Sequence, residues 1–481
     1  MGREDEIIKE RLKKVKDLRS EGINPYPAKF DKKDSVKECL DSKFGKSVQT
    51  AGRLMTKRDL GKISFCDLMD YSERMQIVFQ DKETPSKVFE FFRKYVDAGD
   101  IVGVRGKIIK TKTGAKSILV EDLKLLTKSI LPLPSKWHGL QDQEERYRKR
   151  YVDLIMNPEV RELFRKKSIF WKSIRNFMEK QGFLEVETPV LENTAGGADA
   201  NPFVTHYNIL DIDVYLRISM GELWQKKLMV GGYEKVFEIG RQFRNEGMSP
   251  EHLQDYTQME FYWAYANYEQ GMALTEEMYK DVTKNVLGSL KFKTREFEID
   301  MGKKWEIYDY EKTLKKLSGV DIYAASKKDI EKKLNELKVK YDTKQDKWKL
   351  VDVLWKNYRK EIAGPGFLVN QPVEISPLSK RKPEDPRKVE RFQIIIAGSE
   401  VGNGYSELND PIDQEERFEE QAKKRKAGDD EAQMHDKDFV DALKYGMPPT
   451  CGFGISERFF SFLVDRPIRD CVLFPFMKPE K

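Results

Sequence analysis

Two sequence runs decide the fold: YEKVFEIGRQFRNEG at residues 233–247 and DYTQMEFYWAYA at residues 255–266. Each run reads as a β-strand, and a short loop containing His252 separates them. Arg244 and Glu246 stand two residues apart, so both side chains point to one face of a sheet. Glu260 and Tyr262 share a face in the same way. An exposed charged hairpin would show the same pattern, so its meaning depends on the rest of the chain.

Around these runs, the sequence predicts alternating helices and strands. We expect helices over residues 162–181 and 268–287. We expect strands over KVFEIGRQF, YTQMEFYWAYA, RFQIIIAGSEV and CVLFPF. The chain contains no internal repeat and no glycine-rich phosphate loop of the type GxxxxGK[ST].

The N-terminal part of the sequence has a different pattern from the rest of the chain. Five short β-like runs lie between about residues 47 and 126, with a helical stretch over residues 85–96 before the fourth: SVQTAGRLM, ISFCDLMD, RMQIVFQ, DIVGVRGKIIK and SILVEDLKLL. Such a series suits a small Greek-key barrel of the oligonucleotide-binding (OB) kind, although a purely structural β-domain fits the pattern as well. The proline-marked segment LPLPSKWHGLQDQEERYRKRYVDL places the domain junction near residue 140.

A helix is expected ahead of this barrel, over residues 4–19. Its apolar stripe comprises Ile8, Leu12, Val15 and Leu18. The other faces carry Lys9, Arg11, Lys13, Lys14, Lys16 and Arg19. These cations could follow a phosphate backbone, but an ordinary solvated face is equally consistent with the pattern.

Composition excludes several classes of protein. The 481 residues are 39% hydrophobic and 35% charged, with a net charge of only +6, so the chain should fold and needs no polyanionic partner. The four cysteines are far apart and there are only four histidines, which disfavours a Cys/His metal site and favours reduced thiols. The charged N-terminus and the lack of a long apolar run predict a cytoplasmic protein with no membrane role.

Three further segments give the hairpin its context: GFLEVETPVL (182–191), GSEVGNGYSELNDP (398–411) and PPTCGFGISERFF (448–460). Together with FRNEG, they resemble in order the motifs of the class II aminoacyl-tRNA synthetases of the lysine, aspartate and asparagine subgroup. The opening ERLKKVKDLRSEGINPYP resembles that of the lysine-specific members. The resemblance covers essentially the whole chain, and several motifs in order are far more specific than one.

The resemblance implies an α+β chain with two domains. Residues 1–140 would form the N-terminal helix and a five-stranded OB-type barrel that binds the anticodon, and residues 141–481 an antiparallel-sheet catalytic domain with surrounding helices. The implied activity is the ATP-dependent conversion of L-lysine to lysyl-adenylate and its transfer to the 3′ end of tRNA(Lys). The first motif, with Pro189, implies a homodimer.

The resemblance also assigns roles at the ATP site. Arg244 would hold the α-phosphate and the lysine carboxylate together, and Glu246 would bind the adenine amino group. A planar guanidinium can bridge two anions by forked hydrogen bonds, which brings nucleophile and electrophile together without a general base. Tyr256 would stack on adenine, His252 would assist at the phosphates, and Arg458 would cover the opposite face of adenine.

The lysine pocket implied by the resemblance comprises Gly197, Glu222, Glu260, Tyr262, Asn403, Tyr405 and Glu407. Two carboxylates and a hydroxyl, from Glu260, Glu407 and Tyr262, are natural partners for a compact ammonium. Glu222 and the backbone near Gly197 would bind the α-ammonium, with Asn403 at the carboxylate and Tyr405 as an aromatic wall. In the barrel, Phe65 and Gln76 would stack on and read the central anticodon base.

Four departures from the family pattern stand out. The loop reads HLQDYT where lysine enzymes read HNPEFT, and GFGISER is one residue and one glycine shorter than GxGxGxxR. One residue is inserted just before Glu222. The first of two magnesium carboxylates is replaced by Gln393, which leaves Glu400. Since Mg²⁺ binds mostly phosphate oxygens and water, we expect it to bind still, as fewer or weaker ions.

Two alternatives remain open at this point. An aspartate or asparagine enzyme would share the barrel, Arg244, Phe65 and Gln76, but an anionic substrate would call for arginine rather than two glutamates. A catalytically impaired RNA-binding paralogue is suggested by Gln393 and the shortened third motif. The retention of four functional residues argues against it: Arg244, Glu246, Glu400 and Arg458.

Overall fold

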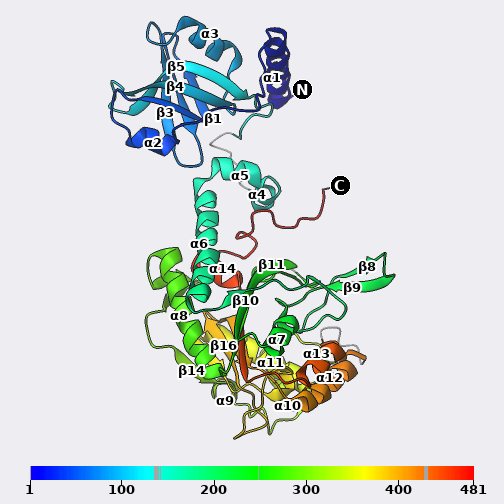
Figure 1. Cartoon of the computed structure of the whole chain (residues 1–481). Coiled ribbons are helices and arrows are strands. Elements are labelled where there is room, and N and C mark those ends of the chain that lie inside the picture. Colours follow the sequence, from blue (N-terminus) through cyan, green and yellow to red (C-terminus); the bar gives the residue numbers. More distant parts are fainter. Residues whose placement is uncertain (1, 135–139, 141, 248, 427–431, 481) are drawn as a thin grey trace. The chain divides into compact units, whose positions relative to one another are not determined.

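The computed structural model describes residues 2–134, 140, 142–247, 249–426 and 432–480 (Figure 1). The chain divides into two compact units, Met1–Arg146 and Tyr147–Lys481. The junction expected near residue 140 falls beside residues 135–139 and 141, which lie outside the described ranges. Helix α4 (Gln143–Arg148) spans the boundary between the units along the chain.

The first unit contains the expected five-stranded barrel, which is closed in the order β1-β2-β3-β5-β4. Its strands are β1 (Ser47–Asp59), β2 (Ile63–Met69), β3 (Arg74–Gln80), β4 (Ile101–Lys110) and β5 (Lys116–Thr127). Helix α3 (Ser86–Tyr95) precedes the fourth strand, as predicted, and α2 (Val36–Asp41) precedes the first. Residues alternate between buried and partly exposed along β2, so one set of side chains fills the barrel and the other faces outward.

Helix α1 (Arg3–Ser20) confirms the helix expected over residues 4–19, but its buried stripe differs from the prediction. Val15 and Leu18 are buried, whereas Leu12 is 45% exposed and Arg11 is buried in its place. The guanidinium of Arg11 donates hydrogen bonds to three backbone carbonyls, of Ala98 at 2.8 Å, Leu131 at 2.9 Å and Ser129 at 3.0 Å. An arginine can be buried in this way because its fixed fork of donors finds acceptors on all sides.

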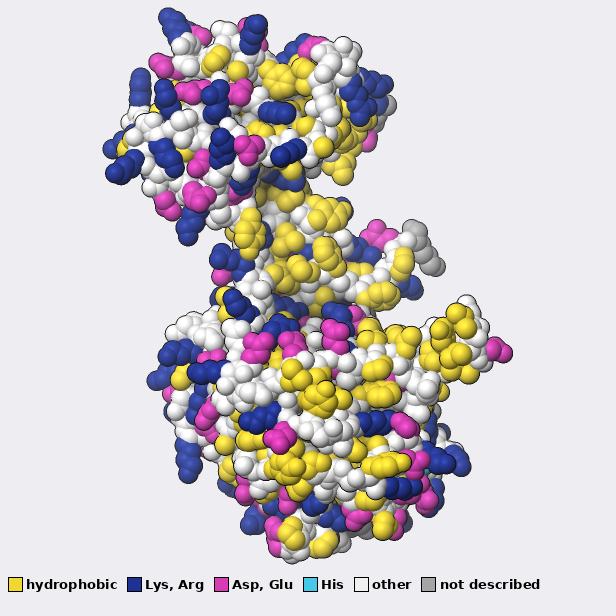
Figure 2. All heavy atoms as spheres, viewed as in Figure 1, with side chains coloured by type: hydrophobic (Ala, Val, Ile, Leu, Met, Phe, Trp, Pro, Cys, Tyr) yellow, Lys and Arg dark blue, Asp and Glu magenta, His cyan; other side chains and the backbone are white. Residues whose placement is uncertain are grey.

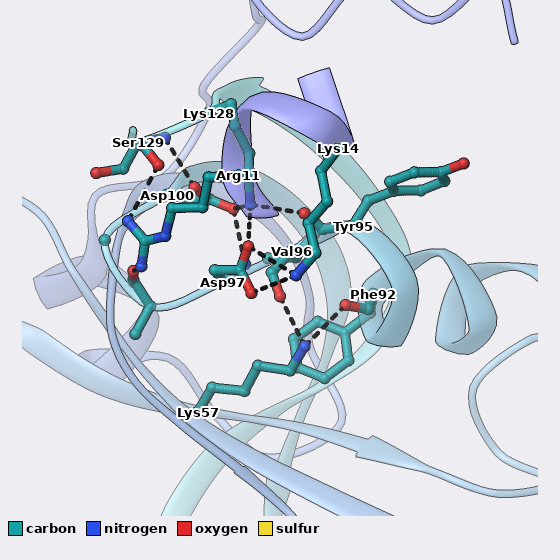
Figure 3. Close-up of polar contacts among 12 residues, drawn as sticks. Arg11, Lys14, Lys57, Phe92, Tyr95, Val96, Asp97, Asp100, Lys128 and Ser129 are labelled. Atoms are coloured by element: carbon teal, nitrogen blue, oxygen red, sulfur yellow. Dashed lines mark hydrogen bonds and ion pairs between the residues drawn. The ribbon is translucent and has the colours of Figure 1, made fainter. Parts of the chain in front are cut away.

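A cluster of cations and backbone carbonyls fixes α1 to the barrel (Figure 3). Lys14 donates to the Asp97 carboxylate at 2.8 Å, and the fully buried Lys128 donates to Asp100 at 2.7 Å and to the carbonyl of Tyr95 at 2.7 Å. Lys57 caps the C-terminus of α3 by donating to the Val96 carbonyl at 2.6 Å. Arg11 and Lys14 therefore hold the helix in place, and the exposed basic residues of α1 are Arg3, Lys9, Lys13, Lys16 and Arg19.

The second unit is built on an eight-stranded sheet in the order β14-β15-β16-β17-β18-β11-β10-β6. Its strands are β6 (Leu184–Glu185), β10 (Lys235–Phe243), β11 (Asp255–Ala264), β14 (Glu306–Asp309), β15 (Gly366–Val369), β16 (Arg391–Ile396), β17 (Ser399–Ser406) and β18 (Thr450–Ser456). The pairings from β15 through to β10 are antiparallel, and only the two edge pairings are parallel. The α+β architecture with an antiparallel sheet is confirmed.

The two faces of this sheet have opposite character, as the alternation along β11 predicts. Met259 and Phe261 are buried in a core formed with helices α6 (Pro158–Lys180), α8 (Tyr268–Leu287) and α14 (Arg458–Leu463). The intervening Gln258, Glu260 and Tyr262 lie on the other face. One face of the sheet is therefore the hydrophobic core, and the other is left for polar side chains.

The remaining elements surround this sheet or form small sheets of their own. The strands are β7 (Leu191–Glu192), β8 (Val204–Tyr207), β9 (Ile212–Leu216), β12 (Lys291–Thr294) and β13 (Phe297–Asp300). The helices are α5 (Arg150–Met156), α7 (Glu222–Val230), α9 (Tyr310–Ser318), α10 (Lys327–Glu336), α11 (Lys347–Tyr358), η1 (Arg359–Glu361), η2 (Val373–Ile375), α12 (Pro411–Lys426) and α13 (Lys437–Leu443). Within the described ranges, no helix is long and apolar enough to span a membrane.

Two strand predictions were wrong. RFQIIIAGSEV is not one strand but two, β16 and β17, joined by a tight turn at Ala397 and Gly398, which have φ of 47° and 73°. Such left-handed pairs form the two-residue turns of hairpins. CVLFPF forms turns rather than a strand, and Leu473 and Phe474 are 43% and 66% exposed. Pro475 in this run has no backbone amide with which to join a sheet.

Candidate active site

The polar face of the sheet contains a cavity of about 320 Å³. Segments far apart in the sequence contribute to its lining, among them β11, β17, β18 and the start of α7. Most residues that the resemblance assigned to ATP, lysine or metal line this cavity: Gly197, Glu222, Arg244, Tyr256, Glu260, Tyr262, Glu400, Asn403, Tyr405, Glu407 and Arg458. The structure thus brings together side chains that are more than two hundred residues apart.

The glycines of β18 explain how these side chains can converge. β18 lies between β11 and β17, with Gly452 between Tyr262 and Tyr405, and Gly454 between Glu260 and Asn403. A Cβ atom on Gly452 would come within 2.1 Å of Glu407 Oε1, and one on Gly454 within 3.2 Å of Glu260 Cγ. Only glycine at both positions keeps the middle of this face open for the polar groups of its neighbours.

Glu260 is held by three hydrogen-bond donors although it is almost fully buried. It accepts from the backbone amide of Met220 at 3.1 Å, from Gln258 Nε2 at 2.6 Å and from the Tyr262 hydroxyl at 3.1 Å. Burial, together with the negative charge of Glu222, raises the pKa of Glu260 to about 7. The carboxylate is therefore poorly compensated in the absence of a cation.

Glu407 and Glu222 share a cation that the sequence analysis did not single out. Lys226 Nζ lies 2.7 Å from Glu222 Oε1 and 2.6 Å from Glu407 Oε2, and all three side chains are buried. Burial raises the pKa of Glu407 well above its usual value despite Lys226. Burial alone would lower the pKa of Lys226, but Glu222 and Glu407 raise it. The i, i+4 spacing of Glu222 and Lys226 on a helix was the available signal.

Two tyrosines complete this part of the cavity. The Tyr405 hydroxyl donates a short hydrogen bond to Glu222 Oε1, and the Tyr262 hydroxyl donates to Glu260. Burial raises the pKa of both tyrosines well above the usual value, so both remain protonated donors at neutral pH.

The glycine just before Glu222 lies at the start of α7, next to the cavity. Gly221 is the N-cap of α7 with a left-handed φ of 65°, and a Cβ there would come within 2.0 Å of Thr188 Oγ1. Gly197 also has a left-handed φ, of 86°, and a Cβ on it would come within 2.9 Å of Glu222 Cβ. Gly221 therefore forms the turn that starts α7, and the backbone of Gly197 packs directly against Glu222.

Arg244 and Tyr256 lie on facing ends of the hairpin. Arg244 follows β10; its backbone amide donates to Gln254 at 2.7 Å, and its Nε donates to the Ile218 carbonyl at 3.3 Å. Its guanidinium lies 5.8 Å from the centre of the Tyr256 ring. A cation and an aromatic face thus line the same cavity, as the assignment of phosphate and adenine contacts requires.

Arg458 is paired with Glu251, a residue that the sequence analysis did not predict. Arg458 Nε donates to Glu251 at 3.0 Å, Ser399 donates to it at 3.1 Å, and Arg295 forms a short ion pair with it. Burial alone would raise the pKa of Glu251, but Arg458 and Arg295 outweigh it and lower this pKa to about 2. Partial burial and the charge of Arg458 lower the pKa of neighbouring His252 to about 4, so this ring is neutral at pH 7.

Glu246 and His252 do not line the cavity, unlike the other residues assigned to ATP. Glu246 is exposed, and its Oε1 accepts from the backbone amide of Asn201 at 3.3 Å. The ring of His252 contacts Ser249 Oγ at 2.8 Å. Both residues lie on the loop of the hairpin, beside the site rather than in its wall.

The two residues considered for magnesium lie together. Gln393 and Glu400 both line a second cavity of about 280 Å³, and Glu400 lines the first cavity as well. Glu400 Oε2 lies 3.6 Å from Arg359. Among the residues described, no group of three or more His, Cys, Asp or Glu side chains could hold a metal ion.

In the first unit, Phe65 and Gln76 both lie on the outward face of β2 and β3. Phe65 pairs with Val78 and Gln76 with Asp67, so the two side chains are diagonal neighbours. Both are half-buried, and the Gln76 side chain accepts from Ser117 Oγ at 2.9 Å. The exposed Arg58 of β1 lies directly opposite Phe65. The barrel therefore presents an aromatic ring, an amide and a cation on one surface.

Comparisons with known proteins agree with this geometry. Residues 142–478 match the family of tRNA synthetases class II (D, K and N), and residues 48–126 match the OB-fold nucleic acid binding domain. The chain therefore belongs to the class II tRNA synthetases of the D, K and N group.

Its relatives include proteins named lysine–tRNA ligase. That of Thermosipho africanus is 45% identical over 98% of this chain and 96% of its own length. That of Thermotoga maritima is 45% identical over 99% and 97%, and that of Thermoanaerobacter sp. (strain X514) is 46% identical over 99% and 97%.

Proposed function

We propose that this chain is a lysine–tRNA ligase, which activates L-lysine with ATP and transfers it to tRNA(Lys) in the cytoplasm. The observation that carries the proposal is the set of three buried carboxylates, Glu222, Glu260 and Glu407, in one cavity with Arg244. Buried carboxylates are costly unless a cation compensates them, and lysine brings two ammonium groups. An aspartate side chain would meet repulsion here.

The decisive experiment is pyrophosphate–ATP exchange measured with each amino acid in turn. We expect exchange with lysine and little with any other amino acid, aspartate and asparagine included. Exchange with no amino acid would favour the impaired paralogue, and preference for aspartate would overturn the assignment of the pocket.

The reaction needs positioning more than proton transfer. A carboxylate oxygen of lysine attacks the α-phosphorus of ATP, the bond to the bridging oxygen breaks, and pyrophosphate leaves. The attacking carboxylate is already ionised, so no general base is required. Arg244 would hold both anions at contact distance and neutralise the charge that accumulates between them. A hydroxyl of the terminal tRNA adenosine then attacks the lysyl carbonyl and releases AMP.

The contacts of Asn403 support its proposed role at the lysine carboxylate. Its Oδ1 accepts from Arg391 Nε at 2.8 Å. Because arginine only donates, this contact turns the amide oxygen towards Arg391 and leaves the NH₂ group as a donor. The remaining roles are those that the resemblance implies, and all of these residues line the cavity: Glu260, Glu407 and Tyr262 for the ε-ammonium, Glu222 and the Gly197 backbone for the α-ammonium, and Tyr405 as the wall.

For ATP, Tyr256 would stack on adenine and Arg458 would bind from the other side, with Glu246 and neutral His252 reaching in from the hairpin loop. Glu400 supplies a carboxylate and Gln393 an amide oxygen beside it. This set fits Mg²⁺ held largely by phosphate oxygens and water, where the ion neutralises phosphate charge. One carboxylate and one amide oxygen are too few protein ligands to hold the ion tightly without nucleotide.

Phe65→Ala should weaken tRNA charging and leave lysine activation unchanged, because Phe65 lies on the barrel and the reaction takes place in the second unit. A base stacked on an aromatic ring contributes about 1–3 kcal/mol, so kcat/KM for tRNA should fall roughly five- to a hundredfold. The matched control is Phe44→Ala, an exposed phenylalanine that precedes β1. If Phe65→Ala lost pyrophosphate exchange without tRNA to the same extent, tRNA recognition and lysine activation would not be separate functions of the two units.

The second unit exposes an apolar surface that we propose as the homodimer interface. This dimer patch comprises Leu184, Val190, Leu191, Val204, Tyr207, Ile209, Leu210 and Ile212, all between 38% and 83% exposed. They lie on the segment that contains the first motif and on the hairpin β8–β9, which Figure 2 shows as a projecting hydrophobic (yellow) cluster. Contiguous apolar surface of this kind marks an interaction site.

Ile209→Glu should therefore shift the protein from dimer towards monomer and reduce activity in proportion. Ile209 is 83% exposed in the single chain, so the charge should not disturb folding. The measurement is sedimentation, where the wild type should have twice the 56.3 kDa chain mass. Tyr445→Glu, at a side chain 89% exposed elsewhere, is the control that should stay dimeric. An active wild-type monomer would contradict the proposal.

A further inference from the structure

Lys226 is a buried charged residue that pairs with two of the cavity's carboxylates without lining the cavity itself, and the reaction described above gives it no task. Its side chain is 1% exposed and bridges Glu222 and Glu407 at 2.7 and 2.6 Å. Its ammonium also lies 5.4 Å from the ring of Tyr405 and 5.8 Å from that of Phe439. A buried ammonium is retained against a large desolvation cost only where its partners are well placed, which is the case here.

The charges around Lys226 do not balance without a ligand. Glu222 and Lys226 come from α7, Glu260 comes from β11, and Glu407 directly follows β17. The other titratable groups that face Glu407 are Tyr262, Tyr405 and Cys451, whose pKa values are all raised, so these groups are neutral. When all three carboxylates are ionised, which a bound cation favours, three carboxylates and one ammonium leave two negative charges, the number that the two ammonium groups of free lysine neutralise.

The two oxygens of Glu407 have different surroundings. Oε2 is the atom paired with Lys226, whereas Oε1 accepts no hydrogen bond from any residue that the structure describes. Oε1 lies against Gly452, where even a Cβ atom would be only 2.1 Å away. Oε1 is itself buried, so a cationic ligand would reach it from the cavity that Glu407 lines.

We propose that Lys226 is a positioning residue that sets the charge of the lysine pocket: it occupies one oxygen of Glu407, favours the ionised form of that carboxylate, and leaves the other oxygen for the substrate. The inference rests on the proposed function and adds a specificity determinant to it. With Lys226 in place, two positive charges rather than three are needed to neutralise the ionised carboxylates of the pocket. A substrate with two ammonium groups fits this deficit.

Lys226→Met removes the charge and nearly preserves the side-chain shape. We expect the KM for lysine in pyrophosphate exchange to rise about tenfold or more at pH 7, with kcat and the KM for ATP little changed. Lys227→Met is the matched control, because this neighbour on α7 is partly exposed and pairs with Asp438 at the surface. Lys227→Met should behave as the wild type.

The pH profile separates an electrostatic role from a merely structural one. Burial already raises the pKa of Glu407, and Lys226 lowers it. Without Lys226, that pKa rises further, so more of Glu407 is protonated at pH 7 and lysine binds less well. Raising the pH restores the carboxylate. The ratio of lysine KM between Lys226→Met and wild type should therefore be smaller at pH 9 than at pH 7.

A double variant covers the case in which Lys226→Met alone folds poorly. Lys226→Met/Glu407→Gln removes the charge of Glu407 together with its cation, so Glu222, which keeps its hydrogen bond from Tyr405, is the one carboxylate of the trio that loses Lys226 as a partner. If Lys226 acts through Glu407, the double variant should have about the lysine KM of Glu407→Gln alone. Additive losses, or a pH-independent loss in Lys226→Met, would overturn the inference. If the wild type itself lacks lysine-dependent exchange, the proposed function fails instead.

Discussion

Arg244→Ala will abolish lysyl-adenylate formation and leave tRNA binding nearly intact. Arg244 is the guanidinium that lines the cavity next to Tyr256, and in the proposed reaction it alone contacts both the attacking carboxylate and the α-phosphate. Removing one pre-positioned donor from a developing charge costs about 10²–10³ in rate. The loss should be at the upper end of this range, because Arg244 also holds the reactants together.

The measurement is lysine-dependent pyrophosphate exchange alongside equilibrium binding of tRNA. Arg241→Ala is the matched control, since Arg241 lies three residues earlier, on β10, but is exposed and paired with Asp255. Its exchange activity should stay close to that of the wild type. Wild-type exchange in Arg244→Ala would remove this residue from the reaction.

Glu260→Gln and Glu407→Gln, made separately, should each raise the lysine requirement steeply and leave the ATP requirement unchanged. Each substitution takes one charged acceptor from the substrate ammonium. A charge-assisted hydrogen bond is worth about 1.5–3 kcal/mol, or roughly ten- to a hundredfold in apparent lysine affinity. A pair of surface carboxylates would contribute below about 1 kcal/mol.

The raised pKa of Glu260, about 7, adds a pH dependence to this test. A carboxyl group with a raised pKa is protonated below that value, so lysine affinity in the wild type should weaken as the pH falls through about 7. Glu260→Gln should lose this dependence. Glu269→Gln, on the exposed surface of α8, is the control expected to retain it. Wild-type lysine affinity in both pocket variants would mean that neither carboxylate contacts the substrate.

The fold could be predicted largely from the sequence, because its main signals are local. The alternation along residues 255–266 separates the core side of β11 from its polar side, and five short strands with one helix determine the barrel. The hairpin of β16 and β17 was missed because its turn, Ala397 and Gly398, is short and follows an apolar run without a polar break. On α1, the structure buries Arg11 and exposes Leu12, the reverse of the prediction. The carbonyls that bind Arg11 are about a hundred residues away along the chain, so the local pattern could not show them.

The site was predictable only where a motif exists. The resemblance to the synthetase family identified Arg244, Glu260 and Glu407 as candidate site residues. In the structure, all three line one cavity. Lys226 and Glu251 were missed for a physical reason: a charged residue in a helix or loop is ordinarily solvated, and only the tertiary fold reveals that it is buried against opposite charge. Whether Glu246 and His252 contact ATP remains a prediction, since both lie beside the cavity in the ligand-free chain.

Glu251 has a consequence for how nucleotide would enter. In the ligand-free chain, Arg458 and Arg295 already hold an anion, the carboxylate of Glu251. Binding of a triphosphate at Arg458 would then exchange one anion for another. The carboxylate of Glu251 would leave the two arginines as phosphate oxygens take its place. Arg458 and Arg295 therefore always have a counter-ion, which reduces the repulsion between them when no nucleotide is bound. We would therefore expect a lower affinity for ATP, and easier release of product, than with two arginines that had no carboxylate partner.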